Sequence, residues 1–145
     1  AGVGTNRNGG NITVTAGAPT GTRTSGAIDL SASRCLFRYT FSARTANYTV
    51  TAGDGGTVFS NVGAGATVNF TLPTAAAGLV YTFIVEAAQT LQVTAGASTT
   101  IRLGGSVSAA AGNITNATFG GVVILVATST TTWVSVSTIG TWTVT

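Results

Sequence analysis

The chain has 145 residues, of which 44% are apolar and only 6% are charged, and its formal net charge is +3, with no lysine or histidine. This length is sufficient for one domain with its own core, and no run of about 18 apolar residues is present that could cross a membrane as a helix. The arginines are scattered and form no basic stripe, so composition argues against a membrane-spanning protein and against nucleic-acid binding.

The first 35 residues predict an N-terminal arm or stem. Residues 1–10 lack any apolar period, and residues 9–17 and 26–30 each predict a short strand between glycines that is marginal unless it packs on neighbours. Cys35 is the only cysteine, which excludes an internal disulfide and favours a buried small apolar residue.

Residues 36–145 predict a β-sandwich domain. In residues 36–42 the pattern puts Phe37, Tyr39 and Phe41 on one face of a strand, and we expect this aromatic face to be buried. Arg34 and Arg38 flank it, and a solvated or salt-bridged polar face is favoured for them over nucleic-acid contact. Further strands are predicted at residues 47–51, 57–60, 67–72, 79–85, 90–95, 99–103, 121–127, 132–136 and 141–144. No helix longer than about one turn is predicted.

A turn rich in glycine, residues 52–56, follows the strand at residues 47–51. Asp54 in this turn is predicted to accept a hydrogen bond from a nearby backbone N–H, because one carboxylate is far short of the ligand set that calcium requires. The segment Val-Thr-Ala-Gly occurs at residues 14–17, 50–53 and 93–96, and this unequal spacing argues against a solenoid of fixed repeat over the whole chain.

Residues 68–85 predict two strands joined at a corner. Val68, Phe70 and Leu72 share one face of the first strand, and the same alternation resumes at Leu79. The residues between the strands include a proline, which cannot donate to a sheet, and a glycine, which permits unusual backbone angles. The predicted fold is therefore all-β: an antiparallel, jelly-roll-like β-sandwich with an extended N-terminal arm.

The chain offers little chemistry for catalysis. Its only acidic residues are Asp29, Asp54 and Glu86, which belong to different predicted elements, and histidine is absent. One cysteine without histidine excludes a zinc site, and no glycine-rich loop leads into a lysine and a helix. We therefore predict that the protein is not an enzyme and has no catalytic, metal or cofactor site.

Trp133 and Trp142 are the candidate binding residues. Exposed tryptophans on a β-sandwich can stack against sugar rings, so both are candidates for ligand stacking. Each also lies in a predicted strand of a chain whose core needs bulky side chains, and this second interpretation, burial, is favoured.

Residues 46–145 resemble a module of tailed-bacteriophage virion proteins, including fibres and proteins of the capsid surface. The resemblance lies in Tyr48-Thr-Val-Thr-Ala-Gly-Asp-Gly-Gly, Phe59-Ser-Asn, the Leu-Pro-Thr-Ala-Ala-Ala-Gly corner within residues 68–85, Ala87-Ala-Gln-Thr-Leu, and the closing segment from Trp133 to Trp142. Residues 9–30 are similar to glycine-punctuated stretches of phage fibre stems. The resemblance implies a non-enzymatic virion component, commonly trimeric, and it transfers no binding residues.

These observations predict a structural protein of a bacteriophage virion that decorates or projects from the capsid or tail. The expected partners are other copies of the chain, in a homotrimer, and virion proteins such as major capsid or tail proteins. Low charge supports assembly independently, because subunit contacts would cover apolar faces and edge strands. Two alternatives remain open: a fibre or spike tip that binds a receptor or a host-surface glycan, and a secreted adhesin or pilus-like subunit.

Overall fold

A computed structural model describes residues 38–145, and the chain divides into Ala1–Phe37 and Arg38–Thr145. The predicted arm at residues 1–35, its two short strands, Cys35 and Phe37 lie outside the described residues, so the arm assignment stays a prediction. Within residues 38–145 no helix is long and apolar enough to cross a membrane.

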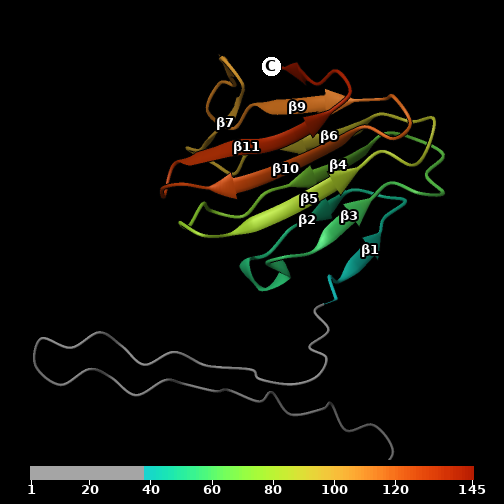
Figure 1. Cartoon of the computed structure of the whole chain (residues 1–145), viewed down its shortest axis with the longest axis horizontal. Coiled ribbons are helices and arrows are strands. Elements are labelled where there is room, and N and C mark those ends of the chain that lie inside the picture. Colours follow the sequence, from blue (N-terminus) through green and yellow to red (C-terminus); the bar gives the residue numbers. More distant parts are fainter. Residues whose placement is uncertain (1–37) are drawn as a thin grey trace, which may run out of the picture. The chain divides into compact units, whose positions relative to one another are not determined.

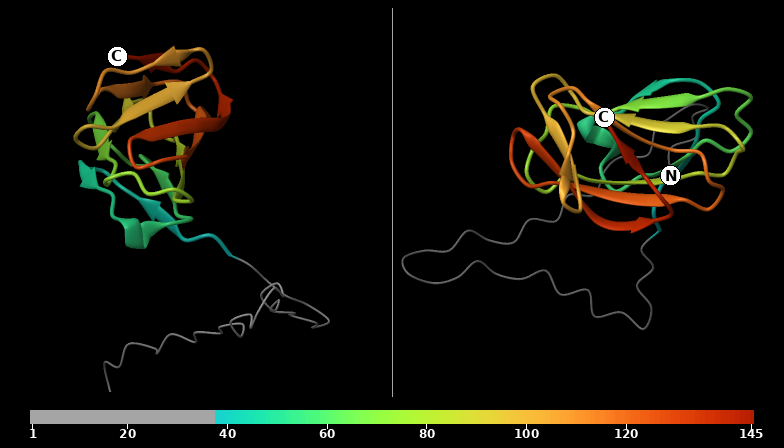
Figure 2. Two further views of the ribbon diagram at one scale, coloured as in Figure 1. Left: turned by 90° about the vertical axis from the view of Figure 1, so that its left-hand side faces the viewer. Right: turned by 90° about the horizontal axis from the view of Figure 1, so that it is seen from above.

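Residues 38–145 fold into two packed β-sheets, seen from three directions in Figures 1 and 2. The seven-stranded sheet has the order β1 (Phe41–Ala43), β3 (Val58–Ser60), β5 (Val80–Ile84), β10 (Val122–Ala127), β11 (Thr132–Ile139), β7 (Thr100–Leu103) and β8 (Ser106–Val107). The five-stranded sheet has the order β12 (Thr143–Val144), β9 (Asn113–Asn116), β6 (Leu91–Thr94), β4 (Val68–Thr71) and β2 (Tyr48–Thr49). The predicted all-β sandwich is confirmed.

The sheets are mixed, whereas the sequence analysis expected antiparallel, jelly-roll-like pairing. From β1 to β6 the chain passes to the opposite sheet after every strand, so β1, β3 and β5 pair in parallel, and so do β2, β4 and β6. The antiparallel pair β10–β11 then lies between β5 and β7. Alternating apolar residues show which side chains face the core, but the alternation is the same for both pairing directions, so it could not reveal this winding.

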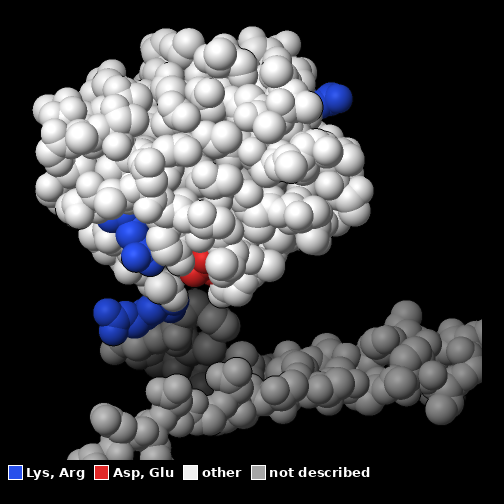
Figure 3. Space-filling model, turned by 180° about the vertical axis from the view of Figure 1, so that it is seen from behind, with Lys and Arg blue, Asp and Glu red and all other residues white. Residues whose placement is uncertain are grey.

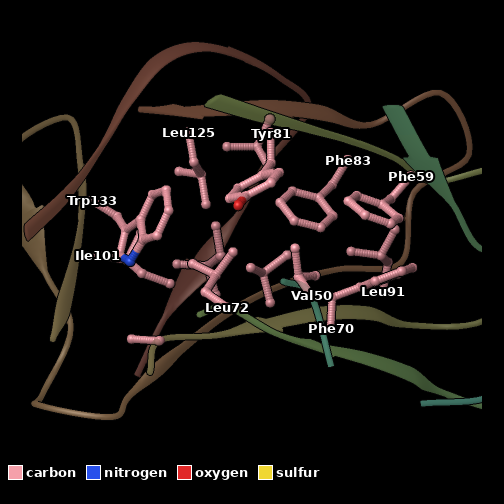
Figure 4. Close-up of a cluster of buried hydrophobic side chains, with 14 of the residues drawn as sticks. Val50, Phe59, Phe70, Leu72, Tyr81, Phe83, Leu91, Ile101, Leu125 and Trp133 are labelled. Atoms are coloured by element: carbon pink, nitrogen blue, oxygen red, sulfur yellow. The ribbon is translucent and has the colours of Figure 1, made fainter. Parts of the chain in front are cut away.

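The core lies between the two sheets (Figure 4). Phe59, Tyr81 and Phe83 extend from the seven-stranded sheet toward Phe70 of the five-stranded sheet, and all four are fully buried. The ring centroids of Phe59 and Phe83 lie 5.5 Å apart, and each lies 5.3 Å from that of Phe70. Aromatic rings at these separations stabilise the core beyond the contribution of their buried area.

The predicted corner between residues 72 and 79 is confirmed. It carries the chain from β4 in one sheet to β5 in the other, and Gly78 adopts a positive φ of 94° that L side chains rarely accept. The Gly78 N–H donates to the Ala127 carbonyl at 3.0 Å, which ties the corner to β10. Gly96 lies against the same corner, because a Cβ there would come within 3.0 Å of the carbonyl oxygens of Leu72 and Pro73.

Two strands of the structure, β8 and β9, were not predicted, and β11 is longer than predicted. β9 has the sequence Asn-Ile-Thr-Asn, in which Ile114 alone gives an apolar signal, and β8 has only two residues. β11 continues to Ile139, beyond the predicted end at Val136, because its last residues pair with β10.

Candidate assembly surface

The outer side of the seven-stranded sheet is mostly apolar, although Thr82 and Ser137 point outward beside Ile124. Its strands alternate, so that Tyr81, Phe83, Val123 and Leu125 fill the core while their neighbours in sequence point outward. The outward residues are half-buried or exposed. We call this set the apolar face; it comprises Phe41, Val58, Val80, Ile84, Val122, Ile124, Val126, Val134 and Ile139.

Strand register aligns the apolar face into rows. Ile84, Val122 and Ile139 are direct cross-strand neighbours, although Ile84 and Ile139 are far apart in sequence. Val80, Val126 and Val134 form a second row in the same way. Side chains directly opposite each other on neighbouring strands are about 5 Å apart, so each row is a continuous apolar stripe.

The outer side of the five-stranded sheet is polar. Asn69, Thr71, Gln92 and Thr94 alternate there with the buried Val68, Phe70, Leu91 and Val93. We call this set the polar face; its members are Asn69, Thr71, Gln92, Thr94, Asn113 and Thr115.

Side chains of the polar face bond to one another. The Thr94 hydroxyl donates to Asn69 Oδ1 at 2.7 Å and accepts from Gln92 Nε2 at 3.1 Å. Asn69 Nδ2 donates to the Thr71 hydroxyl at 3.4 Å. Several polar side chains of this face are therefore hydrogen-bonded to one another.

Within residues 38–145, charged side chains are absent from the polar face and occur only at the margin of the apolar face. Residues 38–145 contain only Arg38, Arg44, Arg102, Asp54 and Glu86 as charged side chains. Arg102 pairs with Val134 at the margin of the apolar face, and the other four lie before β1 or in connecting segments. Seen from behind Figure 1, the described surface shows charge only near its rim (Figure 3).

Strand edges are short in both sheets. The four edge strands β1, β8, β2 and β12 have two or three residues each, and short edges limit edge-to-edge pairing. β11 is different, because β7 pairs with it only over Thr132–Val134. Ser135 and residues 137–139 pair with β10 alone, and Val136 lies at an irregularity in this pairing. Val136 and Ile139 are 62% and 59% exposed.

The aromatic side chains of residues 38–42 face away from the core, contrary to our expectation. Tyr39 and Phe41 are 79% and 57% exposed, so the prediction that this aromatic face is buried is wrong for both. In the register of β1, Ser42 lies beside the core residue Phe59, whereas Phe41 lies beside the outward Val58. Period-two alternation was read correctly, but it does not say which of the two faces turns inward.

The two tryptophans lie inside the domain. Trp133 is fully buried, with its ring 5.5 Å from that of Tyr81, and its Nε1 has no hydrogen-bond partner among residues 38–145 (Figure 4). Trp142 is 7% exposed, and its Nε1 donates to the carbonyls of Val122 and Ile139 at 3.1 and 3.2 Å. Neither indole presents a free face, so the stacking role considered for Trp133 and Trp142 gives way to burial, the interpretation that the sequence favoured.

Asp54 holds its turn together, as predicted. Its carboxylate accepts hydrogen bonds from the Thr51 backbone N–H and hydroxyl, both at 2.8 Å, and from the Tyr48 hydroxyl at 3.3 Å. Burial acts to raise the pKa of Asp54, but these hydrogen bonds and the charge of Arg44 outweigh it and lower the pKa. Arg44 itself lies over the Tyr48 ring, 3.7 Å from its centroid.

The described carboxylates serve separate loops. The Asp54 turn adjoins the start of β5, where the Gly56 N–H bonds to the Val80 carbonyl, and Glu86 follows the end of the same strand. Glu86 accepts a hydrogen bond from the Ser60 hydroxyl, while the buried Asn61 accepts from the Glu86 N–H at 2.8 Å. Asp29 lies outside the described residues. Among residues 38–145, no group of three or more histidine, cysteine or acidic residues could hold a metal.

The sequence analysis did not identify the apolar face, although a signal was present. β10 reads Val-Val-Ile-Leu-Val-Ala, a run that is apolar on both sides of the strand. Such a run is typical of a strand covered on both faces.

Neither a protein-family model nor a curated protein sequence matches the chain.

Proposed function

We propose that the protein is a non-enzymatic structural component of a bacteriophage virion, which decorates or projects from the capsid or tail. The main support for this proposal is the apolar face. A β-sandwich that has few charges and one exposed apolar sheet surface is suited to contacts between subunits. Homotrimers held to major capsid or tail proteins are the proposed assembly, and the resemblance of residues 46–145 to phage virion modules supports it.

Burial of Trp133 and Trp142 weakens the alternative of a glycan-binding tip, because the residues that would stack on a sugar ring are part of the core. The described carboxylates, Asp54 and Glu86, are engaged in separate loops, so neither favours a catalytic role.

Locating the chain in purified particles tests the proposal. Antibody labelling and quantitative mass spectrometry should place it on virions, either in a copy number that matches the capsid lattice or in the few copies of a fibre. A chain found on cells that lack phage particles, and absent from purified virions, would refute the proposal in favour of an adhesin. Binding in a glycan array at low copy number would support the fibre-tip alternative.

A further inference from the structure

Strand β10 has apolar side chains on both of its sides. Its inward residues Val123 and Leu125 are fully buried in the core, and its outward residues Val122, Ile124 and Val126 are equally apolar but half-buried. Sheets with one solvated face usually place polar residues on that face, as β4 and β6 do in this protein. The outer side of the seven-stranded sheet therefore lacks a covering layer within residues 38–145.

The apolar face has the size of a small subunit contact. Its five strands from β1 to β11 are three to eight residues long and lie about 4.8 Å apart, so they cover about 400 Å². Two such faces packed together would bury about 800 Å², which corresponds to a weak interface.

The distribution of charge and the short edge strands indicate which partner covers the apolar face. A partner chosen by charge would need charged groups opposite it, but the nearest on the apolar face is Arg102 at its margin. Two copies of the chain, each with a net charge of +3, repel each other overall. Their apolar faces carry almost no charge, so these faces can pack together without local repulsion. The short edge strands make edge-to-edge pairing a poorer route.

We propose that the apolar face is the contact between copies of this chain, so that the apolar faces of the three chains in the proposed homotrimer point toward a common axis. This inference rests on the proposed function, since it names the surface through which the structural subunit assembles. Ile124 lies in the middle strand of the antiparallel set β5, β10 and β11, between its cross-strand neighbours Thr82 and Ser137, and is expected at the centre of the contact.

Light scattering of the full chain at micromolar concentration tests the proposal. The wild type should have the mass of several 14.3 kDa chains, and Ile124→Arg should reduce it to one chain, because a buried unpaired charge disfavours the contact. Thr115→Arg is the matched control: it places the same charge on the polar face and should leave the mass unchanged. Circular dichroism should show sheet structure in both variants.

A charge-reversal pair tests whether like faces meet. Ile124→Glu alone should also give single chains, and an equimolar mixture with Ile124→Arg should associate again, because opposite charges would then face each other. Should Ile124→Arg fail to fold, Ile124→Thr keeps a β-branched side chain and should weaken self-association about tenfold.

Three outcomes would overturn the proposal: a monomeric wild type, an unchanged mass in the folded Ile124 variants, or no association in the mixture. A segment of the same chain covering the face would give the first of these. A monomeric wild type would also contradict the proposed homotrimer. None of the three outcomes bears on whether the chain occurs in virions, which antibody labelling and mass spectrometry of purified particles test separately.

Discussion

The two sheets of this domain have similar inner faces and opposite outer faces. Inside, both present large apolar side chains such as Phe83 and Phe70. Outside, the seven-stranded sheet presents mainly valine and isoleucine, with Thr82 and Ser137 among them, whereas the five-stranded sheet presents threonine, asparagine and glutamine. Valine and threonine have nearly the same shape and both favour strands, so we expect this difference to affect folding little and association strongly.

Truncating an inner side chain should have the largest effect and sets the scale for the outer faces. Phe83→Ala removes a fully buried ring that lies within 5.5 Å of two others, and it should lower the free energy of unfolding by about 3–5 kcal/mol. Urea denaturation followed by tryptophan fluorescence measures this. A loss below about 1 kcal/mol would mean that the packing between the sheets is not as described.

Making the apolar face resemble the polar face should have the next largest effect, and on association rather than folding. The double variant Ile84→Thr and Val122→Thr changes two cross-strand neighbours on the outer side. We expect the oligomer to dissociate at concentrations where the wild type stays assembled, because apolar burial at the contact is reduced. Sedimentation velocity over a dilution series measures this, and an unchanged association constant would contradict it.

The converse change, an apolar substitution on the polar face, should lower the free energy of unfolding and leave self-association unchanged. Thr94→Val keeps the shape of the side chain but removes its hydrogen bonds with Asn69 and Gln92, which should cost about 1 kcal/mol. Chemical denaturation gives the loss, and light scattering should show the wild-type mass. A gain in self-association would instead mean that any apolar outer face suffices for assembly.

The smallest effect should come from Asp54, which lies on neither face. Because its pKa is lowered in the folded state, ionised Asp54 stabilises the fold above its unfolded pKa of about 4, and that contribution is lost as the pH falls through the folded pKa. Asp54→Asn should lower the melting temperature by about 2 °C at pH 7 and by less at pH 2. Calorimetry at both values checks this, and an equal shift at both would contradict an electrostatic origin.

Much of the inner architecture was predictable because short-range patterns encode it. Alternation located Val68, Phe70, Tyr81 and Phe83 in the core, and the residues near Gly78 marked the corner. Asp54 was recognised as a turn residue, because its neighbours are glycines that allow a tight bend.

Other features depend on partners distant in sequence. Tyr39 and Phe41 looked like core residues, but the side of β1 that turns inward depends on its pairing with β3. Parallel pairing was also hidden, because the chain has to cross to the other sheet before it returns to the same one. The apolar face was missed for the same reason: Ile84 and Ile139 become neighbours only through β10.

The sequence by itself determined that this protein is an all-β sandwich with few charges, because side-chain alternation and composition are local properties. Only the tertiary structure decided which side of each sheet meets water, since strand register is set by contacts between distant segments. The register places most of the outward valines and isoleucines on the seven-stranded sheet, and it places the outward amide side chains and many hydroxyl side chains on the five-stranded sheet.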